Sequence, residues 1–180
     1  MDRIVKGSLL QIAPISSMKR TLKREETKHP LLTIDNNFTP VSGDDGDEFY
    51  PNGIFVFNIT KMIDYIRGHQ AQIFPESIDV RAHRSSFSHL NDDHIEKTDI
   101  SIPIILAEIS PGRFNVIDGN HRIEKAYRSD VDTILAYKLR PDQHIRFLTT
   151  TEAYHAYVEY WNSKVNEENP YRRKKVHHKL

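Results

Sequence analysis

Five consecutive residues, Asp118 to Arg122, bring together a carboxylate, a glycine, an amide, an imidazole and a guanidinium. His121 and Arg122 fall in the first turn of the helix that we expect after Gly119, where the helix dipole repels a positive side chain. An anionic ligand bound at that helix end would account for both of them. The segment is therefore the first candidate for a binding site.

The residues around this segment predict a strand before it and a helix after it. Residues 113–117 are rich in β-branched and aromatic side chains and are bounded by turn residues. Gly119 permits a sharp turn, Asn120 is a good N-cap, and one apolar helix face follows at Ile123, Ala126 and Tyr127. Residues 133–139 predict a returning strand. This strand–turn–helix–strand unit leaves free backbone N–H groups at the turn, so it predicts an anion site there.

The run Asp118-Gly119-Asn120-His121-Arg122, followed by Ile123-Glu124-Lys125-Ala126, resembles the box of the ParB/sulfiredoxin-like superfamily, whose DGxHR-type or Gly-x-x-Arg motif lies between a strand and a helix. The resemblance spans about residues 53–148. It implies an α/β fold of the mixed α+β kind, with a small mixed sheet of four or five strands and packed helices. It also implies a nucleotide pocket around Gly119 and Asn120, with His121 and Arg122 holding the phosphates. An upstream helix would add Thr60 and Lys61 from its first turn.

One departure from the family narrows the chemistry that the resemblance implies. Sulfiredoxins place their catalytic cysteine immediately before the histidine of the box, where this chain has Asn120, and the chain contains no cysteine. Reduction of a sulfinic acid by a thiol mechanism is thereby excluded. The motif is similar to the boxes of the free-serine kinases and of the DGQHR proteins associated with DNA modification.

The resemblance implies a nucleotide-dependent phosphotransferase that uses a nucleoside di- or triphosphate, such as ATP or ADP, with Mg²⁺. Asp118 would be its catalytic residue and would orient a small-molecule or protein hydroxyl acceptor or bind the Mg²⁺. The alternative is a nucleotide- or DNA-responsive binding module of a plasmid, phage or DNA-modification system. That module would touch nucleic acid weakly through the basic runs at 19–24 and 172–179.

A structural interpretation of the box stays open beside the functional one. Asp118 and Gly119 would form a turn, Asn120 a cap, and His121 and Arg122 a solvated first turn. A second structural alternative makes Arg122 the partner of a core carboxylate instead of a ligand for phosphate.

Composition and charge limit the classes of protein to which this chain can belong. The chain has 25 basic and 25 acidic residues, so its formal net charge is zero and gives no global electrostatic case for nucleic acid. The absence of cysteine argues against a disulfide-stapled secreted domain and thiolate metal sites. No apolar leader or run of roughly 18 apolar residues is present. We expect a cytoplasmic protein without membrane contact.

The chain divides into an extension at 1–50 with a basic arm and an acidic loop, a core at 51–168 and a basic tail at 169–180. Within the core, residues 69–99 look like an insertion whose serine- and histidine-rich part would form a lid. Neither these scattered histidines nor the acidic residues near Asp44 have the spacing of a metal site. We therefore predict no metal bound by side chains alone.

Further elements follow from local patterns. We expect an edge strand at 31–34, a loop at 35–52, a strand at 54–57, and a helix capped by Asn58 and closed by Gly68 at C′. A strand at 100–109 should form a hairpin with 113–117 through Pro111-Gly112. A short helix follows Pro141, and a long one starts at Thr149 in a capping box with Glu152. Its buried stripe would be Tyr154, Tyr157, Val158, Trp161 and Val165.

Overall fold

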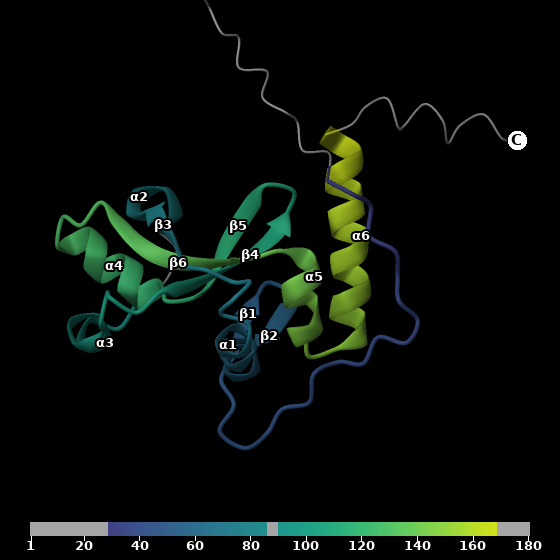
Figure 1. The fold of residues 1–180 in the computed structure, drawn as a ribbon, viewed down its shortest axis with the longest axis horizontal. Helices are drawn as coiled ribbons and strands as arrows, with labels where there is room; N and C mark the ends of the chain where they lie inside the picture. The colour runs from purple at the N-terminus through teal and green to yellow at the C-terminus, as the bar shows by residue number, and fades with distance from the viewer. Residues whose placement is uncertain (1–28, 86–89, 169–180) are drawn as a thin grey trace, which may run out of the picture.

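The structure, a computed structural model, describes residues 29–85 and 90–168. Its main sheet is mixed and has the order β3-β6-β4-β5 (Figure 1). β4 (Ile104–Ser110) runs parallel to β6 (Thr133–Leu139), while β5 (Arg113–Asp118) and β3 (Glu76–Asp79) are antiparallel to their neighbours. The α/β fold class and the small mixed sheet are therefore confirmed. The hairpin through Pro111-Gly112 is confirmed as well, since Gly112 has a positive φ of 69°.

Helices cover both faces of this sheet. On one face, Ile123 and Ala126 of α4 (Asn120–Arg128) pack on Ile104, Leu106 and their neighbours, and α2 (Val80–His83) and α3 (Asp92–Lys97) pack beside α4. On the other face, the core joins the sheet to α1 (Ile59–Gly68) and α6 (Thr151–Glu168). A short connection, α5 (Pro141–His144) and a 3₁₀ turn (Ile145–Phe147), leads from β6 to α6.

A separate two-stranded sheet precedes α1. β1 (Phe49–Asn52) pairs antiparallel with β2 (Phe55–Asn58), so the end of the expected loop at 35–52 is a strand. Asn58 caps α1 as expected, because its side-chain oxygen accepts a hydrogen bond from the Lys61 N–H at 3.0 Å. The expected C′ position of Gly68 is wrong: Gly68 is the last helical residue and His69 is the C-cap, with its N–H bonded to Ile66 O.

Residues 69–99, expected as an insertion, contribute β3 to the edge of the main sheet, along with α2 and α3. Only Ile78 of β3 is buried, which is why the segment lacks the apolar pattern of a strand. The serine- and histidine-rich stretch at 86–89 lies outside the described residues, as do the basic runs at 19–24 and 172–179.

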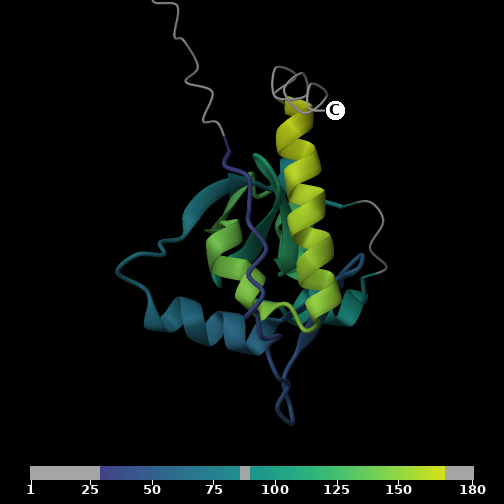
Figure 2. The same ribbon diagram turned by 90° about the vertical axis from the view of Figure 1, so that its right-hand side faces the viewer.

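Residues 29–35 run along α6 as an extended strap, and the expected strand at 31–34 is wrong (Figure 2). The backbone of Leu32 bonds to a side chain instead of a strand, since its N–H donates to Asn162 Oδ1 and its carbonyl accepts from Asn162 Nδ2, both at 2.8 Å. Trp161 Nε1 donates to Pro30 O at 2.9 Å. The strap therefore belongs to the core that α6 organises.

α6 itself buries the expected aromatic stripe. Its start differs from the prediction, because the Thr150 hydroxyl, not that of Thr149, accepts a hydrogen bond from the Ala153 N–H at 3.0 Å. The Thr149 N–H is already bound to Val56 O at 3.1 Å, which ties this residue to β2. In the part of the chain that is described, no helix has the length and apolar character needed to cross a membrane.

Candidate functional site

The box Asp118 to Arg122 lies at the turn from β5 into α4, as the sequence predicts. Gly119 has a φ of 102°, accepts the Ile123 N–H at 3.0 Å and is the N-cap of α4. Asn120 is therefore the first helical residue and not the cap that we expected. Its side chain donates instead to the hydroxyl of Tyr50 at 3.2 Å. The first turn of α4 has no side-chain cap, which leaves its backbone N–H groups available to a ligand.

Gly119 also lies in close contact with the sheet. A Cβ atom at this position would be 2.7 Å from Ile104 Cβ and 2.9 Å from Arg122 Nε. Both the positive φ and this close approach require glycine. The glycine thus fixes where α4 begins relative to β4.

Arg122 is paired with Asp118 inside the box. Its Nη2 donates to Asp118 Oδ2, and the two side chains are 14% and 23% exposed. Arg122 Nε is buried and has no hydrogen-bond partner among the described residues. This is the geometry of the structural interpretation, in which Arg122 is the partner of a carboxylate. Asp118 and Arg122 line the same small cavity, of about 190 Å³, between α1 and the sheet.

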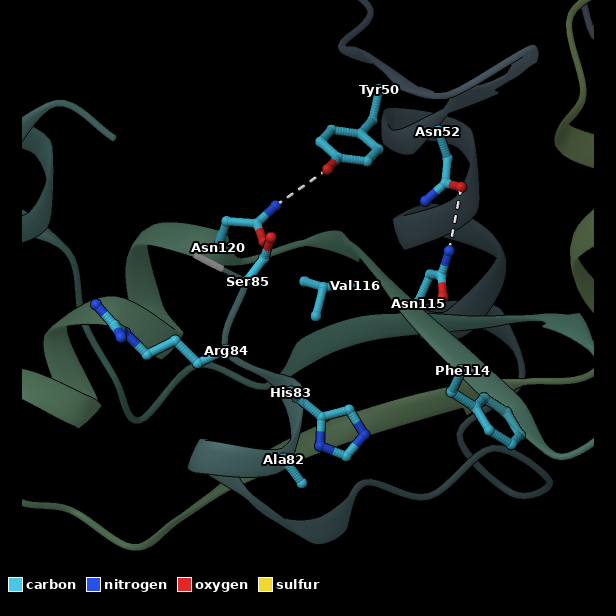
Figure 3. Close-up of a pocket in the computed structure, with 10 residues that line it drawn as sticks. All are labelled: Tyr50, Asn52, Ala82, His83, Arg84, Ser85, Phe114, Asn115, Val116 and Asn120. Atoms are coloured by element: carbon cyan, nitrogen blue, oxygen red, sulfur yellow. Dashed lines mark hydrogen bonds between the residues drawn. The ribbon is translucent and has the colours of Figure 1, made fainter. Parts of the chain in front are cut away.

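A larger cavity, of about 480 Å³, lies along the outer edge of β5 and reaches α2 and β1 (Figure 3). We call it the polar cavity because most of its side chains carry hydrogen-bonding groups: Tyr50, Asn52, His83, Arg84, Ser85, Asn115 and Asn120. Asn115 Nδ2 donates to Asn52 Oδ1 at 3.2 Å, and the Asn120–Tyr50 hydrogen bond spans the opposite side. Phe114 and Val116 add an apolar part to the wall.

The charge of Arg84 in this cavity is compensated. Its Nε donates to Glu124 Oε2 at 2.7 Å and its Nη2 to Glu124 Oε1 at 3.2 Å, while Arg128 Nε donates to the same carboxylate at 2.9 Å. The guanidinium of Arg84, and secondarily that of Arg128, holds the pKa of the Glu124 carboxyl below its usual value. The network ties α2 to α4 and so fixes one wall of the polar cavity.

The remaining predicted site residues lie apart from this cavity. The ring of His121 packs edge-on against that of His94, with the centroids 5.6 Å apart. Thr60 accepts the Glu48 N–H at 2.8 Å, and Lys61 Nζ donates to Ser42 O at 2.8 Å. Lys61 also forms an ion pair of 2.8 Å with Asp44, whose hydrogen bond raises the pKa of the lysine. Thr60 and Lys61 therefore contact the acidic loop and do not lie at the box.

Sequence reasoning missed the residues that complete the polar cavity. One signal was available at Asn115, an amide inside the expected strand at 113–117, where an apolar or β-branched residue is more usual. Among the described residues, no group of three or more histidine, cysteine or acidic side chains is placed to hold a metal ion.

Comparisons with known proteins add no relative. No family model, no curated protein and no solved structure matches this chain.

Proposed function

We propose that this chain is a nucleotide-binding protein of the ParB/sulfiredoxin-like type, which holds the phosphates of a nucleoside di- or triphosphate at the first turn of α4. One observation carries the proposal: this turn has no side-chain cap, and Asn120, its first residue, lines the polar cavity of about 480 Å³. Free N–H groups and the positive end of the helix dipole favour an anion at that place.

The rest of the polar cavity supports a nucleotide more than inorganic phosphate alone. Its volume lies within the range of about 300–1,000 Å³ that is usual for small-molecule sites. The ring of Phe114 offers a surface for a base, and Asn52, Asn115 and Tyr50 offer donors and acceptors for a base or ribose. His83 Nδ1 lies 3.0 Å from Asp79 O, so Nε2 is the ring nitrogen left for a ligand.

Arg122 could contact the phosphate with the N–H groups that are not bonded to Asp118. A guanidinium has five N–H donors, and one hydrogen bond joins Arg122 to Asp118. Arg122 lines the smaller cavity and not the polar one, so a phosphate at the start of α4 would have to draw this fork away from Asp118. Because Asp118 is already paired, the geometry supports nucleotide binding better than phosphotransfer with Asp118 as the catalytic residue. His121 would contribute its backbone N–H, while its side chain packs on His94.

Isothermal titration calorimetry of the full chain with ATP, ADP, CTP, GTP and pyrophosphate, in the presence of Mg²⁺, tests the proposal. Asn120→Asp puts a negative charge at the start of α4, so it should weaken binding roughly tenfold or more by repelling the phosphates. Asn91→Asp is the matched control, because Asn91 caps α3 and does not line the polar cavity. Absence of binding for every ligand, or equal losses in the two variants, would refute the proposal.

Arg122→Ala and Arg122→Lys separate the two roles of the arginine. Contact with phosphate predicts a loss of about ten- to a hundredfold in affinity for alanine, with poor rescue by lysine. A purely structural role predicts a lower melting temperature of the free protein with unchanged affinity. Melting curves without ligand and titrations of the three proteins decide between these outcomes.

A further inference from the structure

We propose that the smaller cavity between α1 and the sheet binds a small apolar monocarboxylate. The cavity has a volume of about 190 Å³, and isoleucines form most of its wall: Ile63, Ile66, Ile102 and Ile105. We call it the apolar cavity. It shares no lining residue with the polar cavity, and Arg122 is the one residue that both proposals use.

The wall of the apolar cavity includes hydrogen-bond donors that have no acceptor among the described residues. Tyr137 is a half-buried residue, and its hydroxyl forms no hydrogen bond with any described residue and is open to solvent. Arg122 has one bonded N–H, to Asp118, and its Nε is buried without a partner in the described part of the chain. A buried donor without a partner, here Arg122 Nε, is costly, and a ligand that supplies an acceptor oxygen would remove that cost.

The charges around the apolar cavity favour a single negative charge on that ligand. Arg67 and Arg122 line it together with one carboxylate, Asp118. Arg67 is 71% exposed and pairs with the exposed Asp64 at 3.2 Å, so water screens its charge, and Arg122, which is 14% exposed, is the cation that a ligand would meet. A carboxylate accepts hydrogen bonds from Arg122 and from the Tyr137 hydroxyl at once, and it matches the planar guanidinium.

The volume sets the size of the apolar part. An apolar cavity of about 150 Å³ is known to hold one benzene ring, so 190 Å³ suits a single ring or a short branched chain and excludes a nucleotide. Ile102 is 51% exposed and lies on the loop before β4, where it forms the rim. A ligand with its apolar body against the isoleucines would cover part of this exposed side chain.

The test titrates the full chain, without nucleotide, with 4-methylpentanoate and with benzoate, and follows isoleucine methyl signals by NMR. We expect saturable binding with a Kd between about 1 µM and 1 mM, the range for ligands of this size. Two controls define the chemistry: 4-methylpentanamide has the body without the charge, and acetate has the charge without the body. Both should bind at least tenfold more weakly.

Two variants locate the site. Tyr137→Phe keeps the wall and removes the hydroxyl, so it should weaken carboxylate binding about tenfold. Tyr65→Phe is its matched control, since Tyr65 is a half-buried tyrosine on α1 that does not line the apolar cavity. Ile63→Phe fills the cavity from the side of α1 and should abolish binding, which keeps the test available if Tyr137→Phe does not fold.

Three results would overturn the proposal: no methyl shifts at 10 mM (on the order of ten times the weakest Kd expected), equal binding of the amide, or equal effects of Tyr137→Phe and Tyr65→Phe. Nucleotide titrations of Tyr137→Phe should match the unaltered protein, because Tyr137 does not line the polar cavity. A failure of carboxylate binding therefore leaves the nucleotide proposal standing, and the reverse holds as well.

Discussion

Gly119→Ala should be among the most destabilising single-methyl additions in this chain. The φ of 102° at Gly119 costs a residue with a side chain about 1–3 kcal/mol. The new methyl would also overlap Ile104, since the built Cβ lies 2.7 Å from Ile104 Cβ, and overpacking of this kind costs about 1–3 kcal/mol. The sum is a loss of roughly 2–6 kcal/mol in the free energy of unfolding.

Urea unfolding followed through Trp161, the single tryptophan and a buried one, measures this loss. With a slope of about 1–3 kcal/mol per molar urea, the midpoint should fall by roughly 1–3 M. Gly46→Ala is the control, because Gly46 has a φ of 89° and nothing within 4 Å of its built Cβ. It should show the backbone cost alone. The double variant Gly119→Ala with Ile104→Ala should lose at least about 1 kcal/mol less than the sum of the singles. If Gly119→Ala costs no more than Gly46→Ala, the close approach of the box to β4 is refuted.

Further predictions concern burial, charge and the strap. Burial lowers the pKa of His144 from 6.5 to about 4, so the ring is neutral in the folded state. The contribution of this neutral ring to the free energy of unfolding is full above pH 6.5 and is lost as the pH falls towards 4. Urea unfolding from pH 7 to 4 should show a loss of about 3 kcal/mol from this group, and His144→Phe should flatten the slope; an unchanged slope contradicts the assignment. Glu124→Gln breaks the charged hydrogen bonds to Arg84 and should lower the free energy of unfolding by roughly 1–2 kcal/mol at pH 7, as measured by urea unfolding. An unchanged free energy of unfolding would mean that solvent fully screens the pair. Asn162→Ala removes both hydrogen bonds to Leu32, which together contribute about 1–3 kcal/mol. Hydrogen exchange of the Leu32 amide should become at least about tenfold faster, while the central β4 amides stay protected. Unchanged exchange at Leu32 would contradict the strap contact.

The elements around the box were predictable because their signals are local. The Pro111-Gly112 turn, the β-branched strand before the box and the apolar face of α4 all follow from short-range patterns, and the structure has them. The sequence analysis left open a carboxylate partner for Arg122 without naming it, and the structure shows that this partner is Asp118, the last residue of β5.

The missed elements depend on partners far along the chain. β1 contains Pro51 and Asn52, which argue against a strand, but pairing with β2 imposes one. β3 is polar and exposed except at Ile78, and its strand character comes from hydrogen bonds to β6. Residues 31–34 have an apolar pattern, yet Asn162 takes the backbone bonds that a strand would have used.

The candidate site was predicted as one pocket, and the structure divides it between two. Asn120 faces the polar cavity, while Asp118 and Arg122 face the apolar cavity. Which side of a strand–helix turn a side chain occupies depends on the twist of β5 and on the packing of α1, and neither is encoded within the five residues of the box.

The strap also bears on the order in which parts of the protein fold. Leu32 and Asn162 are 130 residues apart, and closing a loop of that length in an unfolded chain costs about 4 kcal/mol of entropy plus a constant. The two hydrogen bonds between them do not offset that cost on their own. Once both sheets and α6 are in place, the two partners are already neighbours and the closure is nearly free. We therefore expect the strap to dock after the rest of the core has condensed and to detach first when the protein unfolds.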